Sequence, residues 1–308
     1  MVRHVCALGF VAALAALAVG AVADPSTAPR TAVINPVTLR LKYRDGETLT
    51  YHMVFSTIET EYQNGVQKSN SDDKYDFTIL QTVKSLDMPM QAATIETDVT
   101  LNSESLTTNE RPQKDWVYST LPTHILTSTS VIEPDGKVDS LTDADSNLIH
   151  GMPAFMDTSC QMGSPFFTPD RPVSVGNTWS NSSSVGTWSL GFDTNYRLAN
   201  LLNVKGDLVA TLASTFTGKR NSPHVNQTDY DLTTTVTGNQ TLLFDNTSGV
   251  VQSETSTSQF TDKMVTDPNQ PAPPSGKSVP AYSGEADATD NWTMTLESRT
   301  VTPSTGKA

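Results

Sequence analysis

Residues 39–55 have the sequence LRLKYRDGETLTYHMVF, in which apolar and polar side chains alternate. A period of two places every second side chain on the same face of an extended chain, which is typical of a β-strand with one buried face. Asp45 and Gly46 interrupt the alternation, and this dipeptide favours a hairpin turn. The stretch therefore predicts two neighbouring strands, over 39–43 and 49–55.

The same alternation recurs on both sides of this stretch. It predicts strands over 75–83 and 93–101 in the first half of the chain. In the second half it predicts strands over 207–216, 232–236 and 292–296. Asn64-Gly65 and Pro134-Asp135-Gly136 are typical turn sequences between strands. The pattern indicates a predominantly antiparallel β protein.

One segment has helical spacing instead. Apolar residues Leu141, Ala144, Leu148, Met152 and Phe155 fall on one stripe of a helix. Gly151 and Pro153 interrupt that stripe, so we expect only a short helical segment. We expect residues 35–308 to form a single β domain. The alternative is two β halves, over about 35–140 and 172–300, joined by the segment 141–171, which ends in a proline-rich connector. The Pro-, Ser- and Gly-rich residues 267–284 are expected to form an exposed loop.

The chain begins like a secretory signal peptide. The basic residues Arg3 and His4 precede an apolar run over 5–19, and Ala21-Val22-Ala23 is a small-x-small cleavage site. We expect residues 1–23 to be removed and 24–34 to form a flexible leader. The sequence thus predicts an exported protein, periplasmic or extracellular, with no integral membrane segment after cleavage.

Composition narrows the possible partners. The formal net charge of −13 disfavours binding to nucleic acid, because like charges repel at long range. Without residues 1–23, Cys160 is the only cysteine, so no intrachain disulfide can form. The fold is then expected to be held by packing alone.

No catalytic motif is present, and we expect no catalytic residue, no metal site and no cofactor. The sequence lacks Gly-x-Ser-x-Gly, His-Glu-x-x-His and a phosphate-binding glycine loop. Asp143, Asp145 and Asn147 are spaced like calcium ligands, but Leu148 occupies the position that needs glycine, which favours a helix start. The acidic cluster of Asp72, Asp73 and Asp76 is interpreted as a solvated sheet edge, and His52 as a surface residue.

Three local patterns resemble an uncharacterised exported bacterial family, of the DUF6263 type. They are residues 39–51, the stretch 169–179 that ends in Gly176-Asn177-Thr178-Trp179, and residues 243–251. That family usually has Asp where this chain has Asn177. The resemblance extends at the level of architecture to half-barrel lipoprotein carriers of the LolA and LppX type. It implies no catalytic residues. Together with the alternation, it predicts a mainly β fold: a large curved antiparallel sheet or open half-barrel with one short helical segment.

Three classes of function remain open. The favoured one is a non-catalytic envelope or periplasmic protein with a structural or interaction role, whose partner would be another envelope protein. The alternative is a carrier or binder of a lipid or other apolar ligand on the concave face of the sheet. An enzyme is the third class. For the carrier, the candidate apolar lining residues are Met53, Phe55, Phe77, Trp188 and Phe192.

Overall fold

A computed structural model describes residues 30–32, 36–108, 123–146, 167–185, 190–222, 230–266 and 283–302. All regular elements in these ranges are β-strands. They are β1 (Arg30–Ala32), β2 (Glu47–Gln63), β3 (Val66–Asp87), β4 (Ala92–Thr108), β5 (His124–Ile132), β6 (Val138–Ser146), β7 (Thr178–Val185), β8 (Leu190–Val204), β9 (Asp207–Ser222), β10 (Tyr230–Asp245), β11 (Val250–Thr266) and β12 (Ser283–Val301). The alternating side-chain pattern of the sequence thus becomes long strands such as β2 and β3, which bury alternate side chains.

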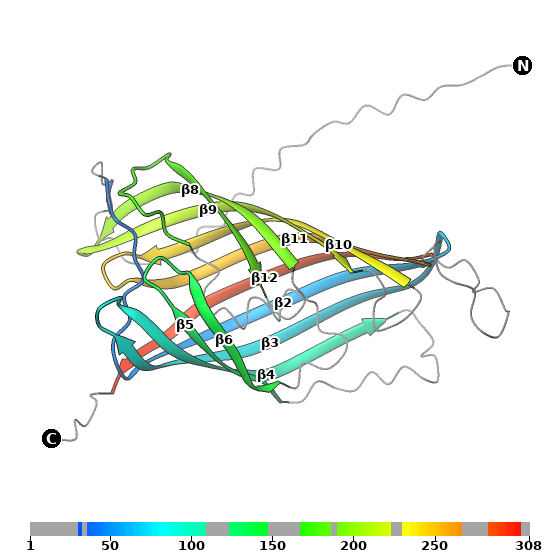
Figure 1. The fold of residues 1–308 in the computed structure, drawn as a ribbon, viewed down its shortest axis with the longest axis horizontal. Coiled ribbons are helices and arrows are strands. Elements are labelled where there is room, and N and C mark those ends of the chain that lie inside the picture. Colours follow the sequence, from blue (N-terminus) through cyan, green and yellow to red (C-terminus); the bar gives the residue numbers. More distant parts are fainter. Residues whose placement is uncertain are drawn as a thin grey trace, which may run out of the picture.

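The described strands form one antiparallel sheet with the order β1-β8-β9-β10-β11-β12-β2-β3-β4-β5-β6, and β7 also pairs with β8. Strand β12 lies between β11 and β2, so strands from both halves of the sequence share the same sheet. Figure 1 shows that the sheet curves into an open trough and does not close into a barrel. The prediction of a large curved antiparallel sheet or open half-barrel is confirmed.

Three boundary predictions are wrong. Residues 141–146 belong to strand β6 rather than a helix, because the turn at Pro134–Gly136 places them directly beside β5; residues 147–156 lie outside the described ranges. Arg30–Ala32 is not leader but strand β1, paired with β8. Ser283 and Gly284, assigned to the exposed loop, begin β12. Residues 1–23 and Cys160 also lie outside the described ranges.

Residues 39–43 do not form the predicted strand. They belong to an extended segment over 36–44, here called the strap, which runs along one end of the trough (Figure 1, blue). Its backbone N–H groups bond to two separate turns: Leu41 N donates to Pro134 O at 2.8 Å and Lys42 N donates to Gly249 O at 3.0 Å. The turn at Asp45-Gly46 exists, but it leads from the strap into β2 rather than joining two paired strands.

Two apolar clusters fill this end of the trough. The strap cluster combines Leu39 and Leu41 with side chains from both ends of the sheet, including Ile95 of β4 and Leu212 of β9. The central cluster is built on β2, β3, β4 and β12. Its main members are Leu49, Tyr51, Met53, Phe55, Phe77, Ile79, Val99, Leu101 and Trp292. We call the face of the sheet that carries both clusters the inner face, and the opposite face the outer face.

Candidate functional site

The inner face changes from apolar to polar along the strands. On β2, the inner positions run from Leu49 to Phe55 and continue as Thr57, Glu59 and Glu61. On β12, the inner side chain that follows Trp292 toward the same end of the trough is Asp290. The change occurs at the same level on neighbouring strands, because the register aligns these positions. On β12, β2 and β3 the inner face therefore has an apolar part and an acidic part that meet.

An aromatic row marks the boundary on the apolar side. Trp292, Phe55 and Tyr75 lie opposite one another on β12, β2 and β3. The rings of Phe55 and Tyr75 are stacked with centroids 6.0 Å apart. Tyr75 stacks in turn on Phe77 at 6.0 Å. Directly opposite inner side chains have Cβ atoms about 5 Å apart, so these residues form a continuous aromatic row, in which Phe55 and Trp292 are buried.

The next row holds Asp290, Thr57 and Asp73 on the same three strands. Beyond it, Glu59 lies opposite two small residues, Ala288 of β12 and Ser71 of β3. Glu61 and Asp262 follow one row further, on either side of Ala286. We call Glu59, Glu61, Asp73, Asp262 and Asp290 the acidic patch.

Asp290 is the most deeply buried member of the acidic patch. Its relative exposure is 1%, and burial raises the pKa of its carboxyl group to about 6, although hydrogen bonds from Thr57 and Ser258 oppose the rise. Its Oδ1 atom has no hydrogen-bond partner among the described residues. A buried oxygen without a partner costs free energy, so it marks a place where a hydrogen-bond donor would be favourable.

Glu59 lies at the centre of the acidic patch. Its pKa is raised to about 7, first by burial and then, in decreasing order, by the neighbouring carboxylates Glu61, Asp262, Asp73 and Asp290. Burial also raises the pKa values of Asp73 and Asp262. This concentration of desolvated like charge is unfavourable for folding by itself.

Basic side chains near these strands mostly lie on the outer face. Lys74 pairs there with Asp72 at 3.7 Å and Lys263 with Glu285 at 2.9 Å. Arg220 of β9 is the exception: it is in the row of Thr234 and Asp262, and its charge lowers the pKa of Asp262. Among the described residues, Arg220 is thus the one basic side chain that lies in a row of the acidic patch.

The interpretation of Asp72, Asp73 and Asp76 as a sheet edge is wrong. Strand β3 pairs with both β2 and β4, so it is interior to the sheet. The alternation of the strand sends Asp73 to the inner face and Asp72 and Asp76 to the outer face. His52 is on the outer face, as predicted for a surface residue, with Nε2 at 2.9 Å from Asp76 Oδ2.

The raised pKa of Glu59 predicts a stability that falls as pH rises. An acid whose pKa is higher in the folded state binds more protons there, so stability present below about pH 4.5 is lost as pH rises to about 7. We expect the free energy of unfolding to be about 2 kcal/mol larger at pH 5 than at pH 8. Denaturant unfolding at both pH values measures this difference.

The substitution Glu59→Gln should remove the part of the pH dependence that Glu59 contributes, about 2 kcal/mol, because glutamine does not titrate. Asp72→Asn, on the outer face of β3, is the matched control and should retain it. A wild-type protein that is equally stable at pH 5 and pH 8 would show that the acidic patch is not desolvated.

A buried polar network lies beside the aromatic row on β9 to β12. Ser214 Oγ donates to Gln240 Oε1 at 2.8 Å, and Trp292 Nε1 donates to Glu254 Oε1 at 2.7 Å. Gln240 also hydrogen-bonds Glu254, whose pKa is raised by burial. The network fixes the indole of Trp292 at the boundary between the apolar and acidic parts.

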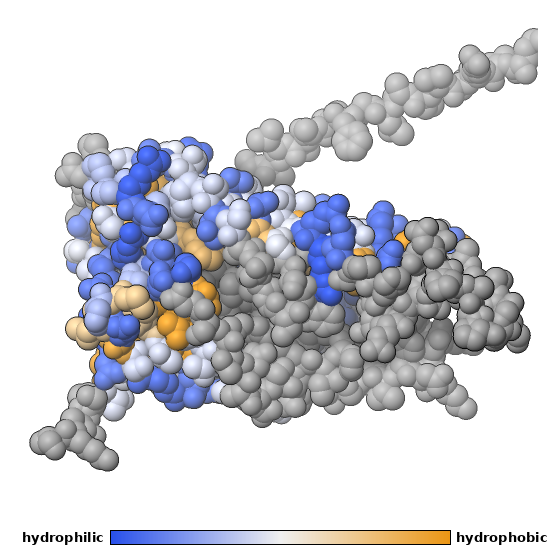
Figure 2. All heavy atoms as spheres, in the orientation of Figure 1, coloured by the Kyte–Doolittle hydropathy of each residue, from blue (hydrophilic) through white to orange (hydrophobic). Residues whose placement is uncertain are grey.

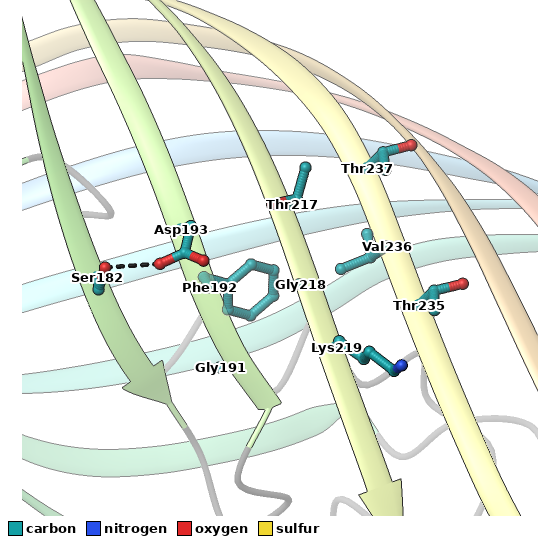
Figure 3. Close-up of a pocket in the computed structure, with 10 residues that line it drawn as sticks. All are labelled: Ser182, Gly191, Phe192, Asp193, Thr217, Gly218, Lys219, Thr235, Val236 and Thr237. Carbon is teal, nitrogen blue, oxygen red and sulfur yellow. Dashed lines mark hydrogen bonds between the residues drawn. The ribbon is translucent and has the colours of Figure 1, made fainter.

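A pocket of about 620 Å³ lies over β7 to β10 (Figure 3). Its lining residues are Ser182, Gly191, Phe192, Asp193, Thr217, Gly218, Lys219, Thr235, Val236 and Thr237. Phe192, Gly218 and Val236 lie opposite one another on β8, β9 and β10. Ser182 Oγ donates to Asp193 Oδ1 at 2.6 Å, which ties β7 to β8 here.

Gly218 and Gly191 allow a matched test of the packing around this pocket. A Cβ atom on Gly218 would lie 2.7 Å from Val236 Cγ1 and 3.1 Å from Phe192 Cδ1, whereas a Cβ on Gly191 meets nothing within 4 Å. We expect Gly218→Ala to lower the free energy of unfolding by about 1–3 kcal/mol through overpacking. Gly191→Ala should change it by less than about 1 kcal/mol, and equal losses in the two variants would contradict the packing.

The predicted lining residues are divided between these regions. Met53, Phe55 and Phe77 are buried in the central cluster, with Phe55 at the aromatic row. Phe192 lines the pocket, and Trp188 lies outside the described ranges. The acidic patch was missed, although Glu59 and Glu61 continue the alternation of Met53 and Phe55, so extending that pattern along β2 would have placed them on the inner face.

Other kinds of site find no support in the described part of the chain. These residues contain no group of three or more His, Cys, Asp or Glu side chains able to hold a metal ion. No helix there has the length and apolarity needed to cross a membrane. Among the residues that Figure 2 colours, the hydrophobic areas lie between hydrophilic ones.

Comparisons with known proteins give only distant likenesses. No family model and no curated protein matches the chain, so the resemblance to the uncharacterised exported family stays a prediction. Among solved structures, lipovitellin is similar over 87% of this chain with a TM-score of 0.40 and 8% identity. This chain spans about a quarter (27%) of the lipovitellin chain.

Outer-membrane channels are similar at a lower level. Pseudomonas aeruginosa OpdQ matches 82% of this chain and 99% of its own, with a TM-score of 0.23 and 7% identity. Salmonella typhi OmpF matches 82% of this chain and 100% of its own, with a TM-score of 0.22 and 10% identity.

Proposed function

We propose that this is an exported, non-catalytic binding protein whose inner face holds an amphipathic ligand. One observation carries the proposal: the aromatic row of Trp292, Phe55 and Tyr75 lies directly beside a row that contains the buried carboxylate of Asp290, one oxygen of which has no partner among the described residues. Binding sites for small molecules combine an apolar wall with a few convergent polar groups.

A purely structural role explains the clusters near the strap but not the acidic patch. A packed core gains nothing from desolvated carboxylates, because each buried charge without a counter-charge costs several kcal/mol. The cost is offset if a ligand supplies the missing donor. The binding role therefore accounts for more of the inner face than the structural or interaction role does.

The small residues around Glu59 give a way to block the proposed site. Ala288 and Ser71 flank Glu59 on the inner face, so Ala288→Phe or Ser71→Leu would fill the space beside it. Ile58 is on the outer face of β2 and is 50% exposed, so Ile58→Phe is the matched control.

Native mass spectrometry of the protein, isolated from an exported fraction and then incubated with dodecyl maltoside, tests the proposal. We expect a bound amphiphile on the wild type and on Ile58→Phe, and at least a tenfold lower bound fraction on the two blocking variants. Thermal unfolding checks that each variant is folded. A wild type that carries no amphiphile as isolated, and none after incubation with dodecyl maltoside, would contradict the binding role.

A further inference from the structure

We propose that the acidic patch recognises an organic ammonium group on the ligand. This inference rests on the proposed function and adds the charge and chemical class of the ligand's polar end. The apolar part of such a ligand would contact the aromatic row, and the ammonium would lie among Asp290, Asp73 and Glu59.

The first argument is charge. The five carboxylates of the acidic patch interact electrostatically around Glu59, while Lys74 and Lys263 are paired on the outer face. Arg220 of β9 lies two strands away from Asp262, and its positive charge lowers the pKa of that carboxyl group. The Asp290, Asp73 and Glu59 end has no such basic residue in its cross-strand rows. A cation is the ligand charge that relieves this repulsion.

The second argument is the oxygen without a partner. Asp290 is almost fully buried, and its Oδ1 accepts no hydrogen bond from any described residue. The carboxyl group is oriented by Thr57 and Ser258, which hydrogen-bond it. An ammonium N–H group supplies both the donor and the positive charge, and charge-assisted hydrogen bonds are about twice as strong as neutral ones.

The third argument is the aromatic row. Phe55 and Tyr75 are one row from Thr57 and Asp73, so their rings border the acidic patch. Aromatic faces attract organic cations within about 6 Å, and most strongly where water is excluded. Beside Glu59 the cross-strand positions carry only the short side chains of Ala288 and Ser71, so no bulky side chain of β12 or β3 stands next to its carboxylate.

A metal ion fits this arrangement less well. The described residues bring no three His, Cys, Asp or Glu groups close enough together to hold a metal ion. Carboxylates that are spread over several rows are better suited to an organic cation, which is larger than a metal ion and can contact carboxylates that lie further apart. The rings of the aromatic row would provide no ligand to a metal ion.

Calorimetric titration with three amphiphiles of equal chain length, kept below micelle-forming concentrations, tests this inference. The probes are dodecylammonium, dodecyl maltoside and dodecyl sulfate. At pH 8 we expect dodecylammonium to bind at least tenfold more tightly than dodecyl maltoside, and dodecyl sulfate to bind most weakly. At pH 5, which lies below the pKa of about 7 for Glu59 and about 6 for Asp290, the preference for dodecylammonium should fall to less than threefold.

Asp73→Asn and Asp72→Asn form the matched pair of variants. They change the same net charge on adjacent residues of β3, but Asp73 is on the inner face and Asp72 on the outer face. We expect Asp73→Asn and Glu59→Gln to weaken dodecylammonium binding at least fivefold and Asp72→Asn to leave it unchanged. Asp290→Asn should act in the same way if it folds, and the other two variants keep the test informative if it does not.

Three results would overturn the inference. Equal affinity for dodecylammonium and dodecyl maltoside would show that the site does not recognise charge, while leaving the proposed binding function intact. Equal weakening by Asp72→Asn and Asp73→Asn would show a non-specific attraction to an acidic protein. If none of the three amphiphiles binds, the proposed function fails together with the inference.

Discussion

Replacing Arg299 by alanine is expected to lower the free energy of unfolding by about 3–5 kcal/mol, because it leaves a charge buried without its partner. Arg299 of β12 pairs through Nε with Glu47 Oε1, and the Glu47 side chain has no exposed area. The guanidinium also donates to Ser248 O at 3.3 Å and to Lys42 O at 3.4 Å. The Arg299 side chain thus links the first residue of β2, the β10–β11 turn and the strap.

Chemical denaturation of the wild type and the variant measures this loss. Lys263→Ala breaks a comparable ion pair with Glu285, but both side chains are exposed, so we expect a loss below about 1 kcal/mol. The double variant Glu47→Gln with Arg299→Ala should recover part of the loss. If Arg299→Ala costs no more than Lys263→Ala, the strap end is not held as described.

Replacing Leu39 by alanine is expected to cost about 2–5 kcal/mol, although Leu39 belongs to no strand. Its side chain is fully buried in the strap cluster, against residues from both ends of the sheet. Removing it leaves a cavity that rigid strands on either side cannot readily close. The strap would then be part of the core that keeps the two ends of the sheet in contact, and not a surface connection.

Val54→Ala is the control for this prediction. Val54 is on the outer face of β2 and is 41% exposed, so its truncation should cost less than about 1 kcal/mol. Urea unfolding midpoints of both variants, with unchanged slopes, would measure the two losses. A loss for Leu39→Ala as small as that for Val54→Ala would contradict the packed strap.

Alternation in the sequence was enough to predict the fold class, because long strands with one buried face leave a regular period of two. The second strand of the opening stretch was correct for this reason: Leu49, Tyr51, Met53 and Phe55 are all buried on the inner face. The first strand was wrong although it alternates equally well. Its backbone donors bond to Pro134 and Gly249, and no local pattern reveals partners so far along the chain.

The helix predicted from Leu141 failed for a similar reason. Apolar residues at helical spacing favour a helix only weakly. At 141–146 the tight turn that precedes β6 allows this segment to pair with β5, and this pairing outweighs the helical preference. The acidic patch could not be predicted from the sequence for a different reason. Asp262, Asp290 and Glu59 are far apart in sequence and meet only because β12 inserts between β11 and β2. Sequence proximity instead singled out Asp72, Asp73 and Asp76, which the strand separates onto two faces.

Photolabelling with a dodecylammonium analogue that carries a diazirine near its amine tests the central claim most directly. The analogue is bound at pH 8, activated by light, and the labelled residues are located by peptide mass spectrometry. Binding on the inner face predicts adducts on Glu59, Ser71 or Ala288 that excess unlabelled dodecylammonium removes. Adducts confined to outer-face residues such as Val54 and Ile58, or insensitive to competition, would contradict a ligand site on the inner face.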